Sequence, residues 1–337
     1  MRAMILEKIG PIDQRPEPLR LVYRERPKPN AGEVLVRVSV CGVCHTELDE
    51  IEGRTPPPAL PVVPGHEAVG IVVERGTNAT KHELNTRVGI GWINRSSGTH
   101  DENLSAEFRA TGRDADGGYA EYVCVHENYA YPIPNCFSDA EAAPLLCAGS
   151  VGYRALKLTN LGNGQILGLT GFGGSGHIVL QLSRFLYPDS PVVVFARSQT
   201  ERDFAIELGA QWAGGTEDAP PEPPHAIIDT TPAWLPVLSA LKNLRPGGRL
   251  VINAIRKEDH DKSLMKAIDY STHLWQEKEL KTVANVTATD ISEFLKIASR
   301  MTLRPEVELY QLERANEALH ELRRGHLRGA KVLKISS

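Results

Sequence analysis

The stretch Gln165–Gly176, QILGLTGFGGSG, decides the fold of this chain. A short apolar run passes directly into a glycine-rich turn, after which Ile178, Leu182 and Phe185 recur at helical spacing. A buried strand, a turn of the form GxGxxG and a helix form the context in which this motif binds a dinucleotide. The alternative is a glycine-rich turn that only packs, and the flanking strand and helix favour the binding site.

Each G position of the GxGxxG motif requires glycine for a physical reason. Gly171 permits the tight turn, Gly173 lets the backbone approach a pyrophosphate, and Gly176 lets the helix pack on the strand. Gly174 belongs to the same turn, and the N-terminus of the following helix favours an anion. We therefore predict cofactor binding at Gly171, Gly173, Gly174 and Gly176.

Strand and helix patterns alternate through the middle of the chain. Apolar strands are predicted at Pro191–Ala196, Ala226–Asp229 and Arg249–Ile255, with helices from Ser198 to Leu208 and over Leu235–Leu244. Strands that alternate with helices predict a parallel, doubly wound sheet. We expect this α/β domain to span residues 149–286.

The end of the strand Pro191–Ala196 selects the form of the cofactor. Sites for NAD place an acidic residue about 20 residues after the glycine turn, where it binds the ribose 2′-hydroxyl. This chain has Ala196, Arg197 and Ser198 there, and a guanidinium suits a 2′-phosphate. We therefore predict binding of NADP(H) through Arg197 and Ser198. NAD(H) is the alternative, with Arg197 as a solvated surface residue.

The first part of the chain is rich in short strands. Val34, Val36, Val38 and Val40 alternate with other residues, which is the period of a half-buried strand. Many short strands separated by turn residues predict an irregular β-barrel-like domain over residues 1–148. Residues 287–337 are expected to return to it. The other predicted elements of both segments are strands at Gly65–Val73, Arg87–Ile93, Gly118–Val125 and Ala330–Ile335, and helices at Ile291–Met301 and Leu312–Arg324.

A thiol and an imidazole in the first part predict a metal site. Cys44 and His66 are separated by a proline-rich connection that no helix can cross, and Cys147 in the apolar run PLLCAG is a third soft donor. Three such ligands with a fourth position open are typical of catalytic Zn²⁺. For Cys147 alone, simple burial is the alternative reading. Cys41 and Cys44 form a CxxC pair, so a redox pair or a metal site shared by these two cysteines is a further alternative.

Composition excludes several classes of protein. The chain has 337 residues, of which 41% are hydrophobic and 24% charged, and a net charge of −4, so neither nucleic acid nor an anionic membrane is an expected partner. The N-terminus lacks the apolar region of a signal peptide, and no apolar run approaches the ~20 residues of a membrane span. The five cysteines are few and odd in number, which favours a reducing compartment and a cytoplasmic protein.

The motifs GVCHTEL, PGHEAVG, GGYAEY, PLLCAGSVGYRAL and ELGA occur in this order along the chain. With them, the chain resembles the zinc-dependent alcohol dehydrogenases of the medium-chain dehydrogenase/reductase superfamily, in particular the bacterial enzymes similar to cinnamyl alcohol dehydrogenase. The resemblance implies a GroES-like catalytic domain built from both ends of the chain, with a Rossmann domain between them. It implies zinc ligands at Cys44, His66 and Cys147, and a homo-oligomer, either a dimer or a tetramer.

The same resemblance implies roles for neighbouring residues. Thr46 relays the proton of the alcohol, and Glu67 is close enough to exchange onto the metal. His45 lies near the cofactor pyrophosphate, Glu47 supports the ligand shell, and Trp92 lines the substrate pocket. The alternatives are a helix cap for Thr46, a surface histidine for His45 and a core residue for Trp92.

The chain departs from the family at two places. The segment Asn94–Phe108, where relatives hold a structural zinc with four cysteines, contains no cysteine. Because serine hydroxyls do not replace four thiolates, we predict one catalytic zinc per chain and no structural zinc. Asp49 stands where many relatives have a histidine, so we expect the proton to leave through Asp49, a ribose hydroxyl or water.

The sequence therefore predicts an NADP(H)-dependent alcohol dehydrogenase or aldehyde reductase acting on a small to medium primary alcohol or aldehyde. One alternative is a zinc-free quinone or enone reductase of the same superfamily, which has no use for three metal ligands. The other is a dinucleotide-binding sensor without catalysis, which turnover would distinguish. The specific substrate, the physiological direction and the oligomeric state do not follow from the sequence.

Overall fold

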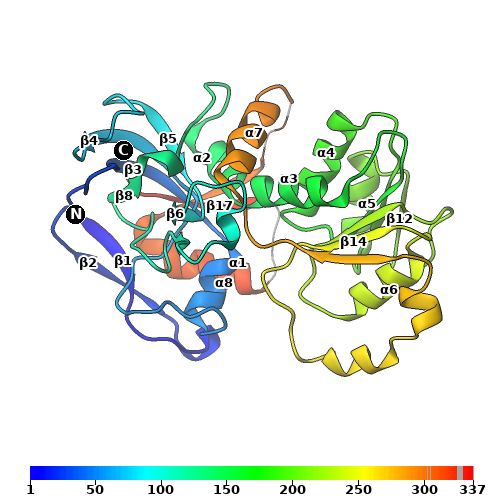
Figure 1. Cartoon of the computed structure of the whole chain (residues 1–337). Helices are drawn as coiled ribbons and strands as arrows, with labels where there is room; N and C mark the ends of the chain where they lie inside the picture. Colours follow the sequence, from blue (N-terminus) through cyan, green and yellow to red (C-terminus); the bar gives the residue numbers. More distant parts are fainter. Residues whose placement is uncertain (302, 304, 325–328, 337) are drawn as a thin grey trace. The chain divides into compact units, whose positions relative to one another are not determined.

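The computed structural model describes every residue except 302, 304, 325–328 and 337. The chain divides into two compact units, one formed by Met1–Ser150 and Val286–Ser337 and the other by Val151–Asn285. In Figure 1 the blue start and the red end of the chain belong to the same unit. The second unit is thus an insertion between the two parts of the first.

The second unit contains a six-stranded sheet in which every pairing is parallel. Counted within the unit, the strand order is 3-2-1-4-5-6, the order of a doubly wound dinucleotide-binding sheet. This confirms the predicted Rossmann fold. From one edge to the other the strands are β12 (Trp212–Gly214), β11 (Val192–Phe195), β10 (Leu167–Thr170), β13 (Ala226–Asp229), β14 (Arg249–Ile252) and β15 (Glu279–Thr282).

Helices cover both faces of this sheet, and Figure 1 shows α4 (Gly176–Leu186) and α6 (Leu235–Asn243) on opposite sides. Apolar residues of α6 pack with those of β13 and β14 in one buried cluster. Helix α5 (Gln199–Glu207) connects β11 to β12. The 3₁₀ turn Lys262–Ala267 and the π turn Tyr270–Leu274 precede β15. We did not predict β12 and β15, because β12 is only three residues long and all four residues of β15 are exposed.

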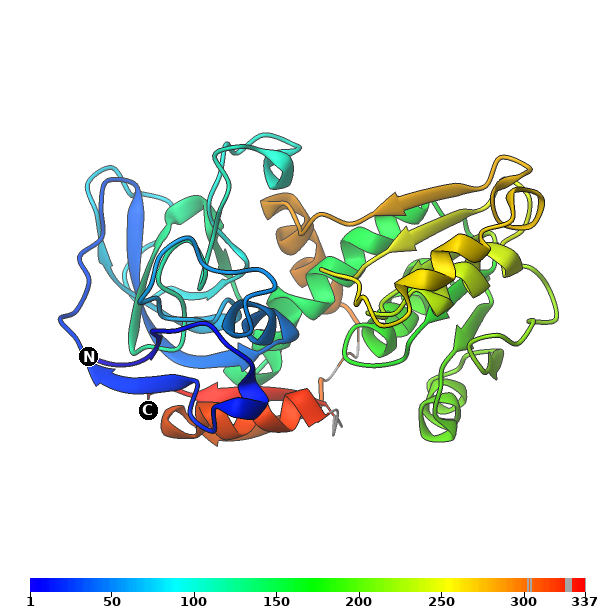
Figure 2. The ribbon, with the colours of Figure 1, turned by 90° about the horizontal axis from the view of Figure 1, so that it is seen from below.

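The first unit is organised by β3 (Glu33–Val43), the longest strand described. Its first half pairs with β8 and its last residues pair with β17, while β4 pairs along its length. In Figure 2 the red C-terminal part of the chain, which contains β17, lies close to blue N-terminal segments, and β17 pairs with β3. The main sheet adds β4 (Ala68–Arg75), β5 (Arg87–Ile90), β8 (Tyr122–His126), β9 (Ala130–Pro132), β16 (Val307–Gln311) and β17 (Ala330–Lys334), and β1 (Arg2–Leu6) pairs with β2 (Leu19–Tyr23).

The helices of the first unit are short. Ser138 and Glu141 form a capping box at the start of α2 (Asp139–Ala142), which is followed by a 3₁₀ turn (Ala143–Leu146). Next along the chain comes α3 (Ala148–Thr159), which begins in the first unit and continues into the second. None of the described helices is both long enough and apolar enough to span a membrane. The remaining elements are α1 (His45–Ile51), α7 (Ala288–Ala298), α8 (Ala315–Arg324) and the 3₁₀ turns Ile12–Gln14, Glu127–Tyr129 and Leu312–Arg314.

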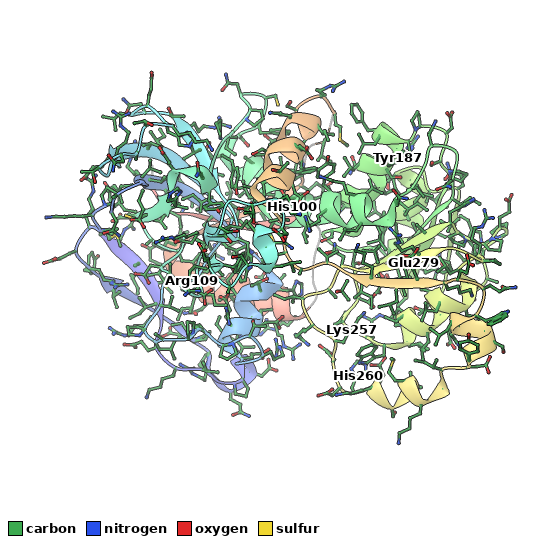
Figure 3. The ribbon with its side chains drawn as sticks, viewed as in Figure 1. His100, Arg109, Tyr187, Lys257, His260 and Glu279 are labelled. Carbon is green, nitrogen blue, oxygen red and sulfur yellow. The ribbon has the colours of Figure 1, made fainter. Side chains whose placement is uncertain are left out.

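The cysteine-free segment is more ordered than a plain loop. A small sheet of β6 (Ile93–Arg95) and β7 (Arg109–Ala110) closes its two ends, and the 3₁₀ turn Glu102–Leu104 lies within it. The side chains of His100 and of the adjoining Arg109 are exposed (Figure 3). Glu102 is buried and accepts hydrogen bonds from the Tyr129 hydroxyl at 2.8 Å and the Ala288 N–H at 2.6 Å. No local pattern in the sequence indicates this anchor, because its two donors lie 27 and 186 positions away along the chain.

Candidate active site

Four potential ligand atoms converge in the first unit. They belong to Cys44, His66, Glu67 and Cys147, and all lie within 4.8 Å of one another. The two sulfurs are 3.8 Å apart, and His66 Nε2 lies 3.2 Å from the Cys147 sulfur. Within the described part of the chain, this is the only cluster of three or more such side chains that could hold a metal. The structure therefore brings together the three ligands expected from the sequence.

Local backbone geometry places the two cysteines. Cys44 follows β3 and precedes α1 as its extended N-cap residue, and its N–H donates to Glu47 Oε2 at 2.7 Å. Cys147 lies at the break between the turn Ala143–Leu146 and α3, with φ −121° and ψ −79°. Each sulfur is therefore held at the end of an element.

A buried carboxylate orients the imidazole. His66 is 1% exposed and Glu47 0%, and His66 Nδ1 lies 2.6 Å from Glu47 Oε1. Burial by itself lowers the pKa of His66. The Glu47 carboxylate and the neighbouring Cys44 raise it by more than burial lowers it, so the net pKa is well above its ordinary value. Without a metal this pKa favours the protonated ring, whereas a metal binds only the neutral ring. In the neutral ring, a proton on Nδ1 shared with the Glu47 carboxylate leaves Nε2 as the acceptor facing the sulfurs.

The two thiols ionise unequally. The pKa of Cys44 lies well below its ordinary value because Cys147 donates a hydrogen bond to it and His66 lies beside it, which outweighs burial. The pKa of Cys147 is raised well above its ordinary value because it donates that hydrogen bond, is buried and would place a second charge beside Cys44. The cluster thus favours one thiolate, and an added cation would favour both.

Glu67 completes the cluster under tight packing. It is 4% exposed, and burial together with the Cys44 charge raises its pKa well above the ordinary value. A Cβ added at Gly42 would lie 1.9 Å from Glu67 Oε2, so a larger residue than glycine would displace this carboxylate.

The donor set fits zinc. Two thiolates on one tetrahedral zinc, with bonds of about 2.3 Å, lie roughly 3.8 Å apart, which is the sulfur separation found here. The same separation is too long for a disulfide, whose sulfurs lie about 2.05 Å apart. Two sulfurs, one imidazole nitrogen and a nearby carboxylate are the ligand types that zinc accepts.

The other predicted residues of this region take different positions. Thr46 is 7% exposed and its hydroxyl oxygen lies 3.7 Å from the Cys44 sulfur, so it borders the cluster. Trp92 is buried, with its ring edge-to-face on His66 at 4.8 Å between centroids. His45 is exposed at the start of α1. Asp49 is buried and accepts a hydrogen bond at 2.6 Å from Arg54.

In the second unit, the glycine turn leads from β10 into α4. Gly171 has φ +79°, which favours glycine, and a Cβ on Gly176 would lie 2.7 Å from the Gly171 carbonyl oxygen. No described atom lies within 4 Å of a Cβ built on Gly173 or Gly174. No described side chain caps the N-terminus of α4. The turn thus has open space and an uncapped helix start, which suit a pyrophosphate.

The residues predicted to read the ribose lie beside this turn. Phe195 at the end of β11 pairs with Thr170 at the end of β10, and its carbonyl accepts from the Gly171 N–H at 2.9 Å. Arg197 is exposed, as a phosphate-binding residue must be. The Ser198 hydroxyl is used as the N-cap of α5 in a capping box with Glu201. The S-x-x-E pattern was visible in the sequence, but we did not connect it with the cofactor.

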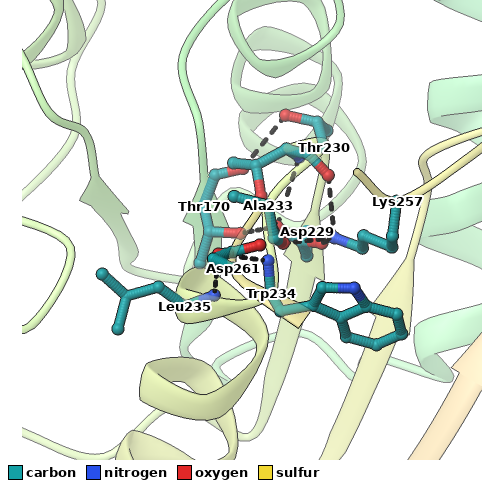
Figure 4. A network of polar contacts seen from close by, with 9 residues as sticks. Thr170, Asp229, Thr230, Ala233, Trp234, Leu235, Lys257 and Asp261 are labelled. Atoms are coloured by element: carbon teal, nitrogen blue, oxygen red, sulfur yellow. Dashed lines mark hydrogen bonds and ion pairs between the residues drawn. The ribbon is translucent and has the colours of Figure 1, made fainter. Parts of the chain in front are cut away.

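A second polar network at the carboxyl edge of this sheet was also missed (Figure 4). The buried Asp229 at the end of β13 accepts from the Thr170 hydroxyl at 2.5 Å and forms an ion pair with Lys257, which follows β14. Lys257 also donates to the Thr231 and Ala233 carbonyls at 2.7 and 3.0 Å. The network ties the loops after β13 and β14 together. A lysine in the polar run RKEDHDK gave no sign of burial.

With this geometry in place, the comparisons with known proteins define the class. Residues 30–135 match the model of the alcohol dehydrogenase GroES-like domain. The chain belongs to the zinc-type alcohol dehydrogenases of the medium-chain dehydrogenase/reductase superfamily.

Individual relatives agree along the whole chain. It is 38% identical to the "Probable alcohol dehydrogenase AdhA" of Mycobacterium tuberculosis, over 99% of this chain and 97% of that protein. It is 33% identical to an alcohol dehydrogenase of Geobacillus stearothermophilus, over 97% and 99%. Among solved structures, the alcohol dehydrogenase of Aeropyrum pernix shares the fold with a TM-score of 0.84 at 24% identity, covering 99% and 100% of the two chains.

Proposed function

We propose that this alcohol dehydrogenase uses one zinc ion per chain and transfers hydride between NADP(H) and a small to medium primary alcohol or aldehyde. The observation that carries the proposal is the convergence of Cys44, His66 and Cys147 at zinc-ligand spacing. When bound, zinc acts as a Lewis acid toward the substrate oxygen. The nicotinamide carries the hydride, and the protein supplies position and electrostatics.

Residues around the metal site orient its ligands, transfer the proton of the alcohol and bind the cofactor. Glu47 holds His66 in the tautomer that presents Nε2, and Glu67 stands ready to exchange into the ligand set. Thr46 holds its hydroxyl at the edge of the cluster, where it accepts the proton of the alcohol and passes it on. That proton leaves through Asp49, a ribose hydroxyl or water, and Trp92 forms an apolar wall beside His66. His45 contacts the pyrophosphate.

The NADP(H) preference rests on the turn after β11. This turn offers the exposed Arg197 guanidinium beside the glycine turn, and Ala196 stands where an acidic residue would bind the ribose of NAD. NAD(H) is the alternative cofactor. Solved structures with the same fold include a cinnamyl alcohol dehydrogenase from Helicobacter pylori with NADP(H) and a protein named NAD-dependent alcohol dehydrogenase, so the fold alone does not select.

We further propose a cytoplasmic homo-oligomer, either a dimer or a tetramer. All five cysteines are free, as in a reducing compartment. The edge strand β15 is exposed, with Leu280 48% exposed, and Trp275 in the turn before it is 55% exposed, which would suit pairing with a second copy. Light scattering on the purified protein tests this, and a monomer at all concentrations would contradict it.

Metal content of the freshly purified protein is the first test of the whole proposal. We expect about one zinc per chain, turnover of primary alcohols with NADP⁺, and loss of both zinc and turnover in Cys44→Ser. A protein that takes up no zinc yet reduces quinones or enones would instead be the zinc-free reductase. Zinc binding without turnover on any alcohol or aldehyde would favour the non-catalytic sensor.

A further inference from the structure

A carboxylate of the protein itself occupies the N-terminus of α5. Glu201 Oε2 accepts from the Ser198 hydroxyl at 2.9 Å and lies 3.3 Å from the Ser198 nitrogen. In return, the Glu201 N–H donates to the Ser198 hydroxyl oxygen at 3.2 Å. The start of this helix, which would favour an external anion, is therefore already next to a negative charge.

This carboxylate lies in the turn that reads the adenosine ribose. The turn after β11 begins one residue beyond Phe195, which is hydrogen-bonded to the first glycine of the dinucleotide turn. Dinucleotides bind at the carboxyl ends of such strands, with the 2′ position of the ribose at the end of the second strand. The hydroxyl of Ser198, which we assigned to the cofactor, is shared with Glu201.

The N-termini of α4 and α5 differ in whether a protein side chain already occupies them. No described side chain caps α4, at which we place the pyrophosphate, whereas Ser198 caps α5 and the Glu201 carboxylate completes its capping box. One of the two arginines near this turn is already engaged in hydrogen bonds within the protein. Arg202 donates to the Ala196 and Arg197 carbonyls at 2.8 and 2.9 Å and so holds the turn in shape. Arg197 remains as the exposed cation of the turn.

We propose that Glu201 is a specificity-determining residue that disfavours the 2′-phosphate, in opposition to Arg197. A 2′-phosphate bound by Arg197 and Ser198 must share the turn with this carboxylate or displace it from Ser198. The uncharged 2′-hydroxyl of NAD(H) meets no such repulsion. Glu201 thus reduces the degree to which Arg197 makes the enzyme prefer NADP(H) over NAD(H). This inference rests on the proposed cofactor site.

The test compares both cofactors in two variants of the zinc-loaded enzyme. Glu201→Gln removes the charge and keeps a side chain able to cap, and Glu201→Ala removes both. We expect the ratio of kcat/KM for NADPH to that for NADH to rise about tenfold in each, the scale of repulsion between nearby charges in a solvated site. Calorimetric dissociation constants for NADP⁺ and NAD⁺ should shift in the same sense.

The chain offers a matched control in the first unit. Ser138 and Glu141 form the same capping box on α2, with both Ser138 donors 2.8 Å from Glu141 Oε2. Glu141→Gln should leave the cofactor ratio within twofold of the native value. An equal rise in this control would overturn the inference, because the effect would then follow from the loss of a cap.

Two other outcomes also count against Glu201. An unchanged ratio in both variants would show that the carboxylate does not meet the phosphate. Weaker use of NADH without a gain for NADPH would make Glu201 the ligand of the ribose hydroxyl. The native ratio separately tests the proposed function, since a native preference for NADH overturns the assignment of Arg197 but leaves the direction of the Glu201 effect measurable.

Discussion

Replacing Glu47 with glutamine tests how the metal site is held together. The carboxylate accepts two hydrogen bonds with different oxygens, from His66 Nδ1 at 2.6 Å and from the Cys44 N–H at 2.7 Å. Glutamine keeps the shape but has one carbonyl oxygen, and its NH₂ group only donates. Glu47→Gln must therefore lose one of the two bonds. Glu47 is fully buried, so little water is available to replace it.

The size of the effect follows from the lost bond. If the NH₂ group faces His66, the ring must move its proton to Nε2 and can no longer present that nitrogen to a metal. If it faces Cys44, a buried N–H is left unpaired, at a cost of about 1–3 kcal/mol. Loss of such a supporting partner typically lowers metal affinity by about 10–100-fold, or roughly 1.4–2.8 kcal/mol. We expect zinc affinity to fall within this range.

The assay is zinc competition against a chromophoric chelator, which needs no catalytic turnover. Glu50→Gln is the matched control, because Glu50 lies on the same helix, is 1% exposed and has an oxygen without a partner among the described residues. Burial, followed by the charge of Glu47, raises its pKa well above the ordinary value, so glutamine resembles its neutral form. The reasoning would be refuted if Glu47→Gln bound zinc within twofold of the native protein, or if Glu50→Gln weakened binding as much.

Three further predictions concern the missed anchors and the cofactor. Glu102→Gln can satisfy only one of the two buried donors, so we expect a loss of about 1–3 kcal/mol in unfolding free energy and faster proteolysis of the cysteine-free segment, with zinc content unchanged. Lys257→Met leaves the buried Asp229 charge unpaired, and urea unfolding should show a loss of about 3–5 kcal/mol that Asp229→Asn partly restores; equal stability of all three proteins would contradict this. Arg197→Asp should shift the kcat/KM ratio toward NADH, and retained NADPH preference would show that Arg197 does not bind the phosphate.

Much of the second unit could be predicted because its signals are local. The strand Ala226–Asp229 has the bounds predicted from its apolar run, and α5 begins directly after Ser198, at which the predicted helix starts. The exposed edge strand β15 escaped prediction because ELKT has no apolar face, and only its neighbour β14 makes it a strand.

For the candidate site, the residue types could be predicted from the sequence but their distances could not. Cys44, His66 and Cys147 were recognisable by residue type and by the motifs around them. Their distances were not, because 103 positions separate the two cysteines, whose sulfurs approach to 3.8 Å only after β3 and the break before α3 are in place. The roles of Glu47 and Glu67 likewise depend on which atoms face the cluster.

The sequence by itself determined the alternation of strands and helices that defines the doubly wound sheet, the glycine turn and the types of ligand, because periodicity, turn chemistry and donor chemistry are properties of neighbouring residues. Only the tertiary structure decided which distant groups meet. Glu102 accepts from the Ala288 N–H across 186 positions, and Lys257 pairs with Asp229 across 28. A buried charge is stable only when the folded chain brings a partner to it, and these partners lie too far away in the sequence for any local pattern to indicate them.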